Sequence, residues 1–194
     1  MKKKNQNMKR TSCSCSKCKH GCTVMPGYLM PSDLMGYLGT RAFIPASRWN
    51  LLASEGTFVA QVNMMTGEMD KFRIPTLVPS TKEDGSCLHY KDGKCGVHND
   101  SPTGCKMFNA CAVGRKAEKQ DEMATEYQQE LLRVWAKWQA VEEGMSEETR
   151  RGHGLEDPTE DEQLYCGAWH YLWKIGKRKE NAAELITKYQ EGVA

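Results

Sequence analysis

The 194-residue sequence lacks any apolar run that approaches the ~20 residues needed to cross a lipid bilayer. Its basic first ten residues lead into cysteines and not into an apolar segment, so no secretory signal is visible. These two absences favour a protein that stays out of the membrane, and we expect it in the reducing cytoplasm.

The sequence is also short of net charge and of familiar catalytic motifs. Lys and Arg total 27 against 25 Asp and Glu, and a net charge of +2 is too small for an electrostatic grip of the whole protein on nucleic acid. There is no Walker A sequence, no G-x-S-x-G and no H-E-x-x-H. Hydrolase and nucleotidyl-transfer chemistry therefore find no support. The sequence assigns no catalytic residue, and whether the protein is an enzyme stays open.

What the sequence does have is nine cysteines, grouped in two clusters with one residue apart: Cys13, Cys15, Cys18 and Cys22; Cys87, Cys95, Cys105 and Cys111; and Cys166. An odd number of cysteines in a reducing compartment argues against a disulfide framework. Thiolates are soft ligands for zinc, iron and iron–sulfur clusters, and a C-x2-C pair such as Cys15 and Cys18 can reach one ion from a single turn. The two clusters predict two halves of a metal site that folding brings together. Redox disulfides and inert thiols are the alternatives.

The composition along the chain predicts an α+β fold in three parts. Residues 1–12 are polar and basic and are expected to form a flexible arm, which is either a tether to an anionic partner or an ordinary solvated terminus. Residues 13–114 are expected to form a small cysteine-rich metal-binding unit with a β-hairpin and loops. Residues 115–194 are expected to form a mainly helical segment packed on that unit.

Local patterns in the cysteine-rich unit predict a short helix and a hairpin. Ser32 is a good N-cap residue ahead of an apolar stretch, so a helix is expected to run to about Gly39. Residues 57–62 and 71–78 are rich in β-branched and aromatic side chains and flank a turn, which predicts a hairpin. Because proline cannot donate to a strand ladder, the prolines at the end of the second run place that strand at an edge.

The last part of the chain has the periodicity of helices. Between Lys116 and Gly144 apolar residues recur at steps of three and four, which predicts an amphipathic helix. Thr159 and Glu162 fit a capping box that opens a second helix, and a third is expected over residues 183–189. The four tryptophans of this part are expected in the core. Cys166 is expected to be a buried thiol outside the metal site, beside a partly exposed His170.

The second cysteine cluster reads CLHYKDGKCGVHNDSPTGCKMF from Cys87 to Phe108. Together with the upstream cysteines and the helix start Met30-Pro31-Ser32-Asp33-Leu34, it resembles the signature of the YkgJ-like cysteine-cluster family, whose members are described as zinc- or iron-chelating domains. The resemblance covers roughly residues 13–111. It implies a metal-binding function, and the ligands it implies are Cys15, Cys18, Cys22, Cys87, Cys95 and Cys105.

Three further residues are candidate ligands: Cys13, Cys111 and His98. Gly21 stands where the family tends to have the first of two adjacent cysteines, and Cys111 could supply the missing thiol. His98 stands where the family has an aromatic residue, three positions after Cys95. An ordinary loop side chain is the alternative for His98.

The thiols alone do not identify the metal. Iron–sulfur clusters usually take four cysteines and permit redox or cofactor-dependent modification chemistry, and the resemblance favours iron, with an iron–sulfur cluster first. Zinc is the alternative, and it would make the protein a zinc-stabilised binding or adaptor module that engages a protein or nucleic-acid partner.

Overall fold

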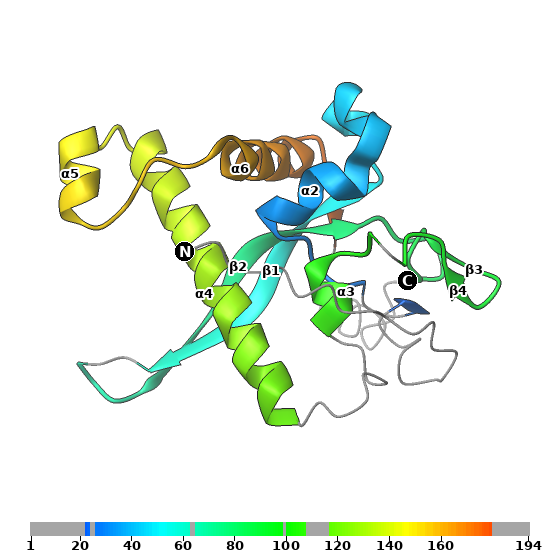
Figure 1. The fold of residues 1–194 in the computed structure, drawn as a ribbon, viewed down its shortest axis with the longest axis horizontal. Helices are drawn as coiled ribbons and strands as arrows, with labels where there is room; N and C mark the ends of the chain where they lie inside the picture. The colour runs from blue at the N-terminus through cyan, green and yellow to red at the C-terminus, as the bar shows by residue number, and fades with distance from the viewer. Residues whose placement is uncertain (1–21, 24–25, 63–64, 99, 108–116, 180–194) are drawn as a thin grey trace, which may run out of the picture.

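The computed structural model describes residues 22–23, 26–62, 65–98, 100–107 and 117–179 of the protein (Figure 1). Its fold is α+β with a mainly helical C-terminal portion, as predicted. The helices are α2 (Pro31–Leu38), α3 (Thr103–Met107), α4 (Ala117–Glu142), α5 (Glu147–Gly152) and α6 (Glu160–Lys174), with short 3-10 turns η1 (Gly39–Phe43) and η2 (Ala46–Arg48). The strands are β1 (Leu51–Val62), β2 (Met69–Pro79), β3 (Tyr90–Lys91), β4 (Lys94–Cys95) and β5 (Arg178–Lys179). The basic arm 1–12 and the helix expected over 183–189 lie outside the described residues.

A long antiparallel hairpin of β1 and β2 is the centre of the fold, and it confirms the predicted hairpin. The register shifts between Ser54 and Thr57, where Gly56 has φ +117° and lies so close to the Ile74 carbonyl that a Cβ atom would sit 1.4 Å from its oxygen. Only glycine tolerates that approach. The described sheet has the order β2-β1-β5, so β2 is an edge strand, as its prolines predicted.

The first helix differs in its start from the prediction. Helix α2 begins at Pro31 and its N-cap residue is Met30, so the assignment of Ser32 as N-cap was wrong. The reason is that Asp33, at the third helical position, accepts the backbone N–H of Met30 at 3.0 Å. That carboxylate supplies the capping bond in place of the Ser32 side chain, and proline is well suited to the first helical position.

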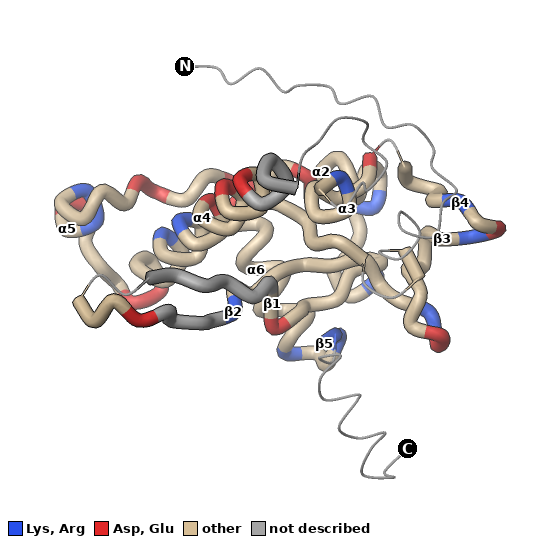
Figure 2. Tube along the Cα trace, turned by 90° about the horizontal axis from the view of Figure 1, so that it is seen from below, with Lys and Arg blue, Asp and Glu red and all other residues tan. Residues whose placement is uncertain are grey.

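The C-terminal helices agree with the periodicity of the sequence. Helix α4 spans most of the predicted amphipathic segment, and α6 begins with the predicted capping box, in which the Glu162 N–H reaches the Thr159 hydroxyl at 3.3 Å and the Thr159 N–H reaches the Glu162 carboxylate at 2.7 Å. Figure 1 shows α4 lying across the β1–β2 hairpin, while α6 packs on α2 and on both long strands. Figure 2 shows charges of both signs along α4 and around α5.

One hydrophobic core joins the cysteine-rich unit and the helical segment. Tyr165 of α6 is fully buried in it, and its hydroxyl donates to the Leu29 carbonyl at 2.8 Å and accepts the Leu77 N–H at 3.0 Å. The indoles of Trp135 and Trp169 pack in or against this core and donate to backbone carbonyls of β2 and β1 at 2.8 Å. The four tryptophans that the sequence analysis expects in the core therefore lie in it or pack against it.

The end of α6 leads into a strand that the sequence analysis does not predict. Residues 178–179 form β5, which pairs in parallel with Ala53 and Ser54 of β1. The Lys177 ammonium donates to the carbonyls of Trp49 and Ser47, at 2.5 and 3.2 Å. None of the described helices combines the length and the apolar character needed to span a bilayer.

Candidate metal centre

The structure describes four members of the predicted ligand set: Cys22, Cys87, Cys95 and Cys105. None of these four is in a disulfide. The remaining cysteines of the two clusters lie outside the described residues: Cys13, Cys15, Cys18 and Cys111.

The four described thiols lie in one neighbourhood. The pKa of Cys22 is raised above its usual value, first by a hydrogen bond between its side chain and that of Cys95, then by burial, and then by the charges of Cys95, Cys105 and Cys87. A residue of the first cluster therefore contacts Cys95 of the second and lies within electrostatic reach of Cys87 and Cys105. That they bind a metal stays a prediction at this point.

A backbone hydrogen bond connects the two clusters directly. The N–H of Cys87 donates to the carbonyl of Cys22 at 2.8 Å. Cys87 follows the edge strand β2 after a short connection. The hydrogen bond ties the backbone of Cys87 to that of Cys22.

Cys95 lies in a small hairpin that the sequence analysis does not predict. Strands β3 and β4 pair Tyr90 with Cys95 around a two-residue turn, in which Asp92 and Gly93 have φ of 51° and 76°. Positive φ at both positions is the signature of a type I′ turn, for which Asp-Gly is a favoured pair. The dipeptide could therefore have identified this hairpin from the sequence.

Cys105 lies on α3, where two glycines, Gly27 and Gly104, allow the backbone around Tyr28 to approach closely. A Cβ atom on Gly27 would lie 2.1 Å from the Cys105 nitrogen, and one on Gly104 would lie 2.5 Å from the Tyr28 nitrogen. The Gly104 N–H donates to the Tyr28 carbonyl at 2.9 Å, and the Gly27 N–H reaches the Cys105 sulfur at 3.2 Å. The close crossing fixes the backbone that carries this thiol.

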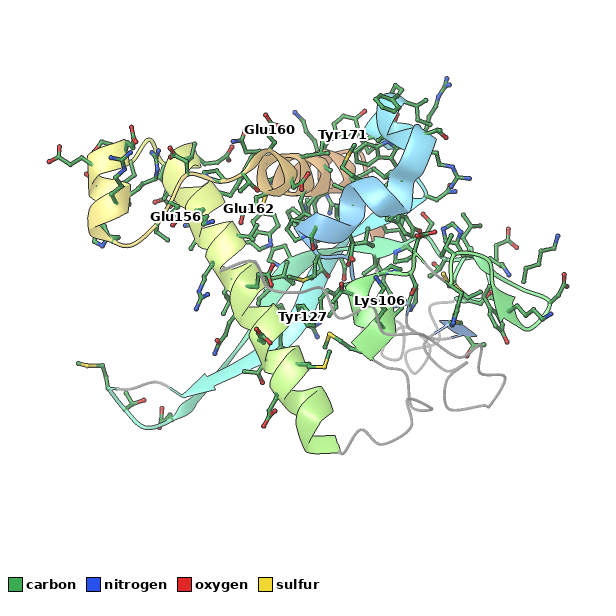
Figure 3. All side chains as sticks on the ribbon, in the orientation of Figure 1. Lys106, Tyr127, Glu156, Glu160, Glu162 and Tyr171 are labelled. Carbon is green, nitrogen blue, oxygen red and sulfur yellow. The ribbon has the colours of Figure 1, made fainter. Side chains whose placement is uncertain are left out.

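Asp33 connects α2 to α3. Its carboxylate accepts the Thr103 N–H at 2.7 Å and the Thr103 hydroxyl at 3.0 Å, in addition to the Met30 N–H. Lys106, labelled on α3 in Figure 3, lies with its ammonium 3.8 Å from the same carboxylate. One side chain of α2 therefore fixes the N-terminal end of the short helix that carries Cys105.

Cys87 opens a tight turn whose backbone affects the pKa of its thiol. Burial raises the pKa of the Cys87 thiol, and Cys95 adds to the rise, but the backbone N–H groups of His89 and Tyr90 hydrogen-bond to the sulfur and oppose it. The Tyr90 N–H also reaches the Cys87 carbonyl at 2.9 Å, which closes the turn. Amide donors aimed at a sulfur atom stabilise its thiolate, which is the form that binds a metal.

A tyrosine–histidine pair lies beside the thiols. The hydroxyl of Tyr37 is 2.6 Å from Nε2 of His89, and the two rings meet edge to face with centroids 5.4 Å apart. Burial raises the pKa of Tyr37, and the charges of Cys87 and Cys105 raise it further. Burial, followed by the charge of Arg41, lowers the pKa of His89 and favours its neutral ring.

Lys179 of β5 is a cation in the same region. Burial lowers its pKa, whereas the charges of Cys87 and Cys105 raise it, so its ammonium lies within electrostatic reach of two thiols. The sequence analysis did not find Tyr37, His89 or Lys179 as neighbours of the thiols, because each comes from a segment distant from the cysteine clusters or has no distinctive spacing.

The structure also describes Cys166 and His98, two further residues considered in the sequence analysis. Cys166 of α6 is fully buried in the hydrophobic core, and the charges that raise its pKa after burial are those of Glu162 and Glu142, not of other cysteines. The prediction that it is a buried thiol apart from the clusters is confirmed for the described residues, and His170 beside it is exposed. His98 is half-buried, and its role as a ligand stays a prediction.

In the described parts of the chain, no group of three or more His, Cys, Asp or Glu side chains already stands in an arrangement that could hold a metal ion. The four thiols can still influence one another's pKa values, because electrostatic effects act over longer distances than metal–sulfur bonds. The donors nevertheless fit a soft metal, because they are all sulfur and two of them accept backbone N–H groups. Partly buried thiols whose ionised forms repel one another favour a bound cation, which removes that repulsion.

Comparison of the chain with protein-family models, with curated proteins and with solved structures found no match. The likeness to the YkgJ-like cysteine-cluster family therefore stays a prediction that rests on the motifs of the sequence.

Proposed function

We propose that this protein binds iron, as an iron–sulfur cluster, through the thiolates of its two cysteine clusters, and that the bound iron serves redox or modification chemistry. The described ligands in this proposal are Cys22, Cys87, Cys95 and Cys105. The ligands proposed from the sequence alone are Cys15 and Cys18, with Cys13, Cys111 and His98 as further candidates.

The observation that carries this proposal is the position of Cys22. This residue of the first cluster shares a hydrogen bond with Cys95 and lies within electrostatic reach of Cys87 and Cys105. Packing alone does not account for four cysteines from four separate segments coming together, because the segments that carry them are short and have few buried apolar side chains. A shared metal ion or cluster explains both the convergence and the stability of those segments.

Iron is favoured over zinc in this proposal by the family resemblance. The number of thiols fits either metal, because a structural zinc ion and an iron–sulfur cluster each usually take four cysteines and the predicted set contains six. A bound cluster would supply electron transfer at this site. The chain's own residues bind it, surround it with amide N–H donors at Cys87 and Cys105, and place Lys179 near the thiolate charge.

Anaerobic purification followed by iron, zinc and acid-labile sulfide analysis and an absorption spectrum tests the proposal. Coloured protein with stoichiometric iron and sulfide supports it. Colourless protein with stoichiometric zinc contradicts the choice of iron and supports the zinc-stabilised binding module. Protein without any bound metal contradicts the metal centre itself. The location in the cytoplasm and the anionic partner of the basic arm 1–12 stay predictions beside it.

A further inference from the structure

Helix α2 touches the thiol-bearing segments at two points. Near its start, Asp33 holds the N-terminal end of the helix that carries Cys105. Near its end, Tyr37 meets His89, two residues after Cys87. The helix itself contains no cysteine. Its contacts with both segments therefore help to position thiols that belong to other parts of the chain.

The Tyr37–His89 contact has the geometry of a specific bond and not of general packing. The hydroxyl-to-Nε2 distance of 2.6 Å is short for a neutral hydrogen bond, and the edge-to-face arrangement of the rings fixes their relative orientation. A second, longer contact of the Tyr37 hydroxyl with the Asn50 carbonyl, at 3.5 Å, leaves His89 as the main partner.

His89 lies in the backbone segment that joins two of the proposed ligands. The Tyr90 N–H reaches the Cys87 carbonyl at 2.9 Å, and the Gly96 N–H, next to Cys95, donates to the His89 carbonyl at 2.8 Å. A bond that fixes the His89 side chain therefore restrains the backbone between Cys87 and Cys95. Residues that orient the ligands of a metal site tune its affinity and its reduction potential.

We propose that Tyr37 is a positioning residue of the metal centre, which acts through His89 to hold the turn of residues 87–90 and, with it, the thiol of Cys87. This inference rests on the proposed function, and it adds an outer layer to the ligand set that the sequence motifs do not contain. Tyr37 touches no ligand sulfur in the described contacts, and its effect is transmitted through the histidine.

Tyr37→Phe removes only the hydroxyl and keeps the ring. Tyr28→Phe is the matched control, because Tyr28 is also buried and precedes the same helix, but its hydroxyl contacts the Met107 sulfur at 3.5 Å and the charges that affect its pKa are not those of cysteines. Each variant is purified anaerobically with its native metal. Metal retention is measured by competition with a chelator, and the metal–thiolate charge-transfer bands and the reduction potential are recorded.

We expect Tyr37→Phe to weaken metal retention about 10-fold or more, which is the usual effect of losing an outer-shell partner. We also expect it to alter the charge-transfer bands and, with iron bound, to move the reduction potential, because the Cys87 ligand is then held less firmly. Tyr28→Phe should leave all three unchanged. His89→Leu should act like Tyr37→Phe, and the double variant should be little worse than either, since both remove one bond.

The outcomes separate the inference from the proposed function. Metal-free wild-type protein overturns both. Metal-loaded wild-type protein whose Tyr37→Phe variant matches Tyr28→Phe in retention and spectrum overturns the positioning role and leaves the metal centre standing. Additive effects of Tyr37→Phe and His89→Leu show independent roles and likewise overturn the inference.

Discussion

Asp33 caps α3 from another helix: its carboxylate accepts both the backbone N–H and the hydroxyl of Thr103, at 2.7 and 3.0 Å, although seventy residues separate the two in the sequence. The same carboxylate caps its own helix at Met30. A single acid thus sets the position of α2 and of the helix that carries Cys105.

Replacing Asp33 by Ala is expected to lower the free energy of unfolding by about 2 kcal/mol, because three donors lose a charged acceptor in a site that is largely shielded from water. Denaturant unfolding measures the change. Ser32→Ala is the control, since Ser32 is exposed and is not the N-cap residue, and it should change stability little. Equal losses for the two variants would mean that Asp33 does not cap α3.

Cys95→Ser should lower the metal content of the purified protein, because the hydroxyl is a poor substitute for a thiolate ligand of a soft metal. It should also loosen residues 80–105, which hydrogen exchange would show. Cys166→Ser should leave the metal content unchanged, because that thiol lies in the hydrophobic core. Full metal occupancy in Cys95→Ser would remove this cysteine from the ligand set.

Gly104→Ala is expected to destabilise the protein by about 1–3 kcal/mol, since its Cβ atom would meet the Tyr28 backbone at 2.5 Å and force two chain segments apart. The displaced helix would carry Cys105 with it, so metal retention should fall as well. Gly36→Ala is a suitable control, because a Cβ atom there meets nothing within 4 Å. Thermal unfolding and metal analysis of both variants decide the matter, and unchanged stability in Gly104→Ala would contradict the close crossing.

Tyr165→Phe should cost on the order of 2 kcal/mol of stability. The variant leaves the Leu29 carbonyl and the Leu77 N–H without the hydroxyl that serves both in the core. Tyr171→Phe, on the exposed side of the same helix and labelled in Figure 3, should change stability little. The two unfolding curves should therefore separate clearly, and their coincidence would show that the buried hydroxyl is not needed.

Lys179→Gln should weaken metal retention, because it removes a positive charge within reach of Cys87 and Cys105 and thiolate ligands carry negative charge. Lys179→Arg keeps the charge and should retain more metal than Lys179→Gln. Chelator competition compares the two variants. If the arginine variant loses as much metal as the glutamine variant, packing and not charge explains the role of this lysine.

Local patterns of the sequence were enough to predict the long hairpin, the edge position of β2, the amphipathic α4 and the capping box of α6. Each depends on residues close together in the chain: alternating β-branched residues, proline, helical periodicity and the Thr159–Glu162 pair. The sequence also singled out Cys22, Cys87, Cys95 and Cys105, whose charges influence one another in the structure. It missed the true N-cap of α2 and the β3–β4 hairpin, although the Asp92-Gly93 turn was a local signal for the latter.

Only the tertiary structure decided which thiols are neighbours and what surrounds them. The amino-acid sequence determined the supply of soft ligands, the helices and the central hairpin, because those follow from residue chemistry and local periodicity. The contacts of Tyr37 with His89, of Asp33 with Thr103 and of Gly27 with Cys105 join segments far apart in the chain. Such contacts depend on how the hairpin and α2 pack on the core, and no spacing within a single segment encodes that packing.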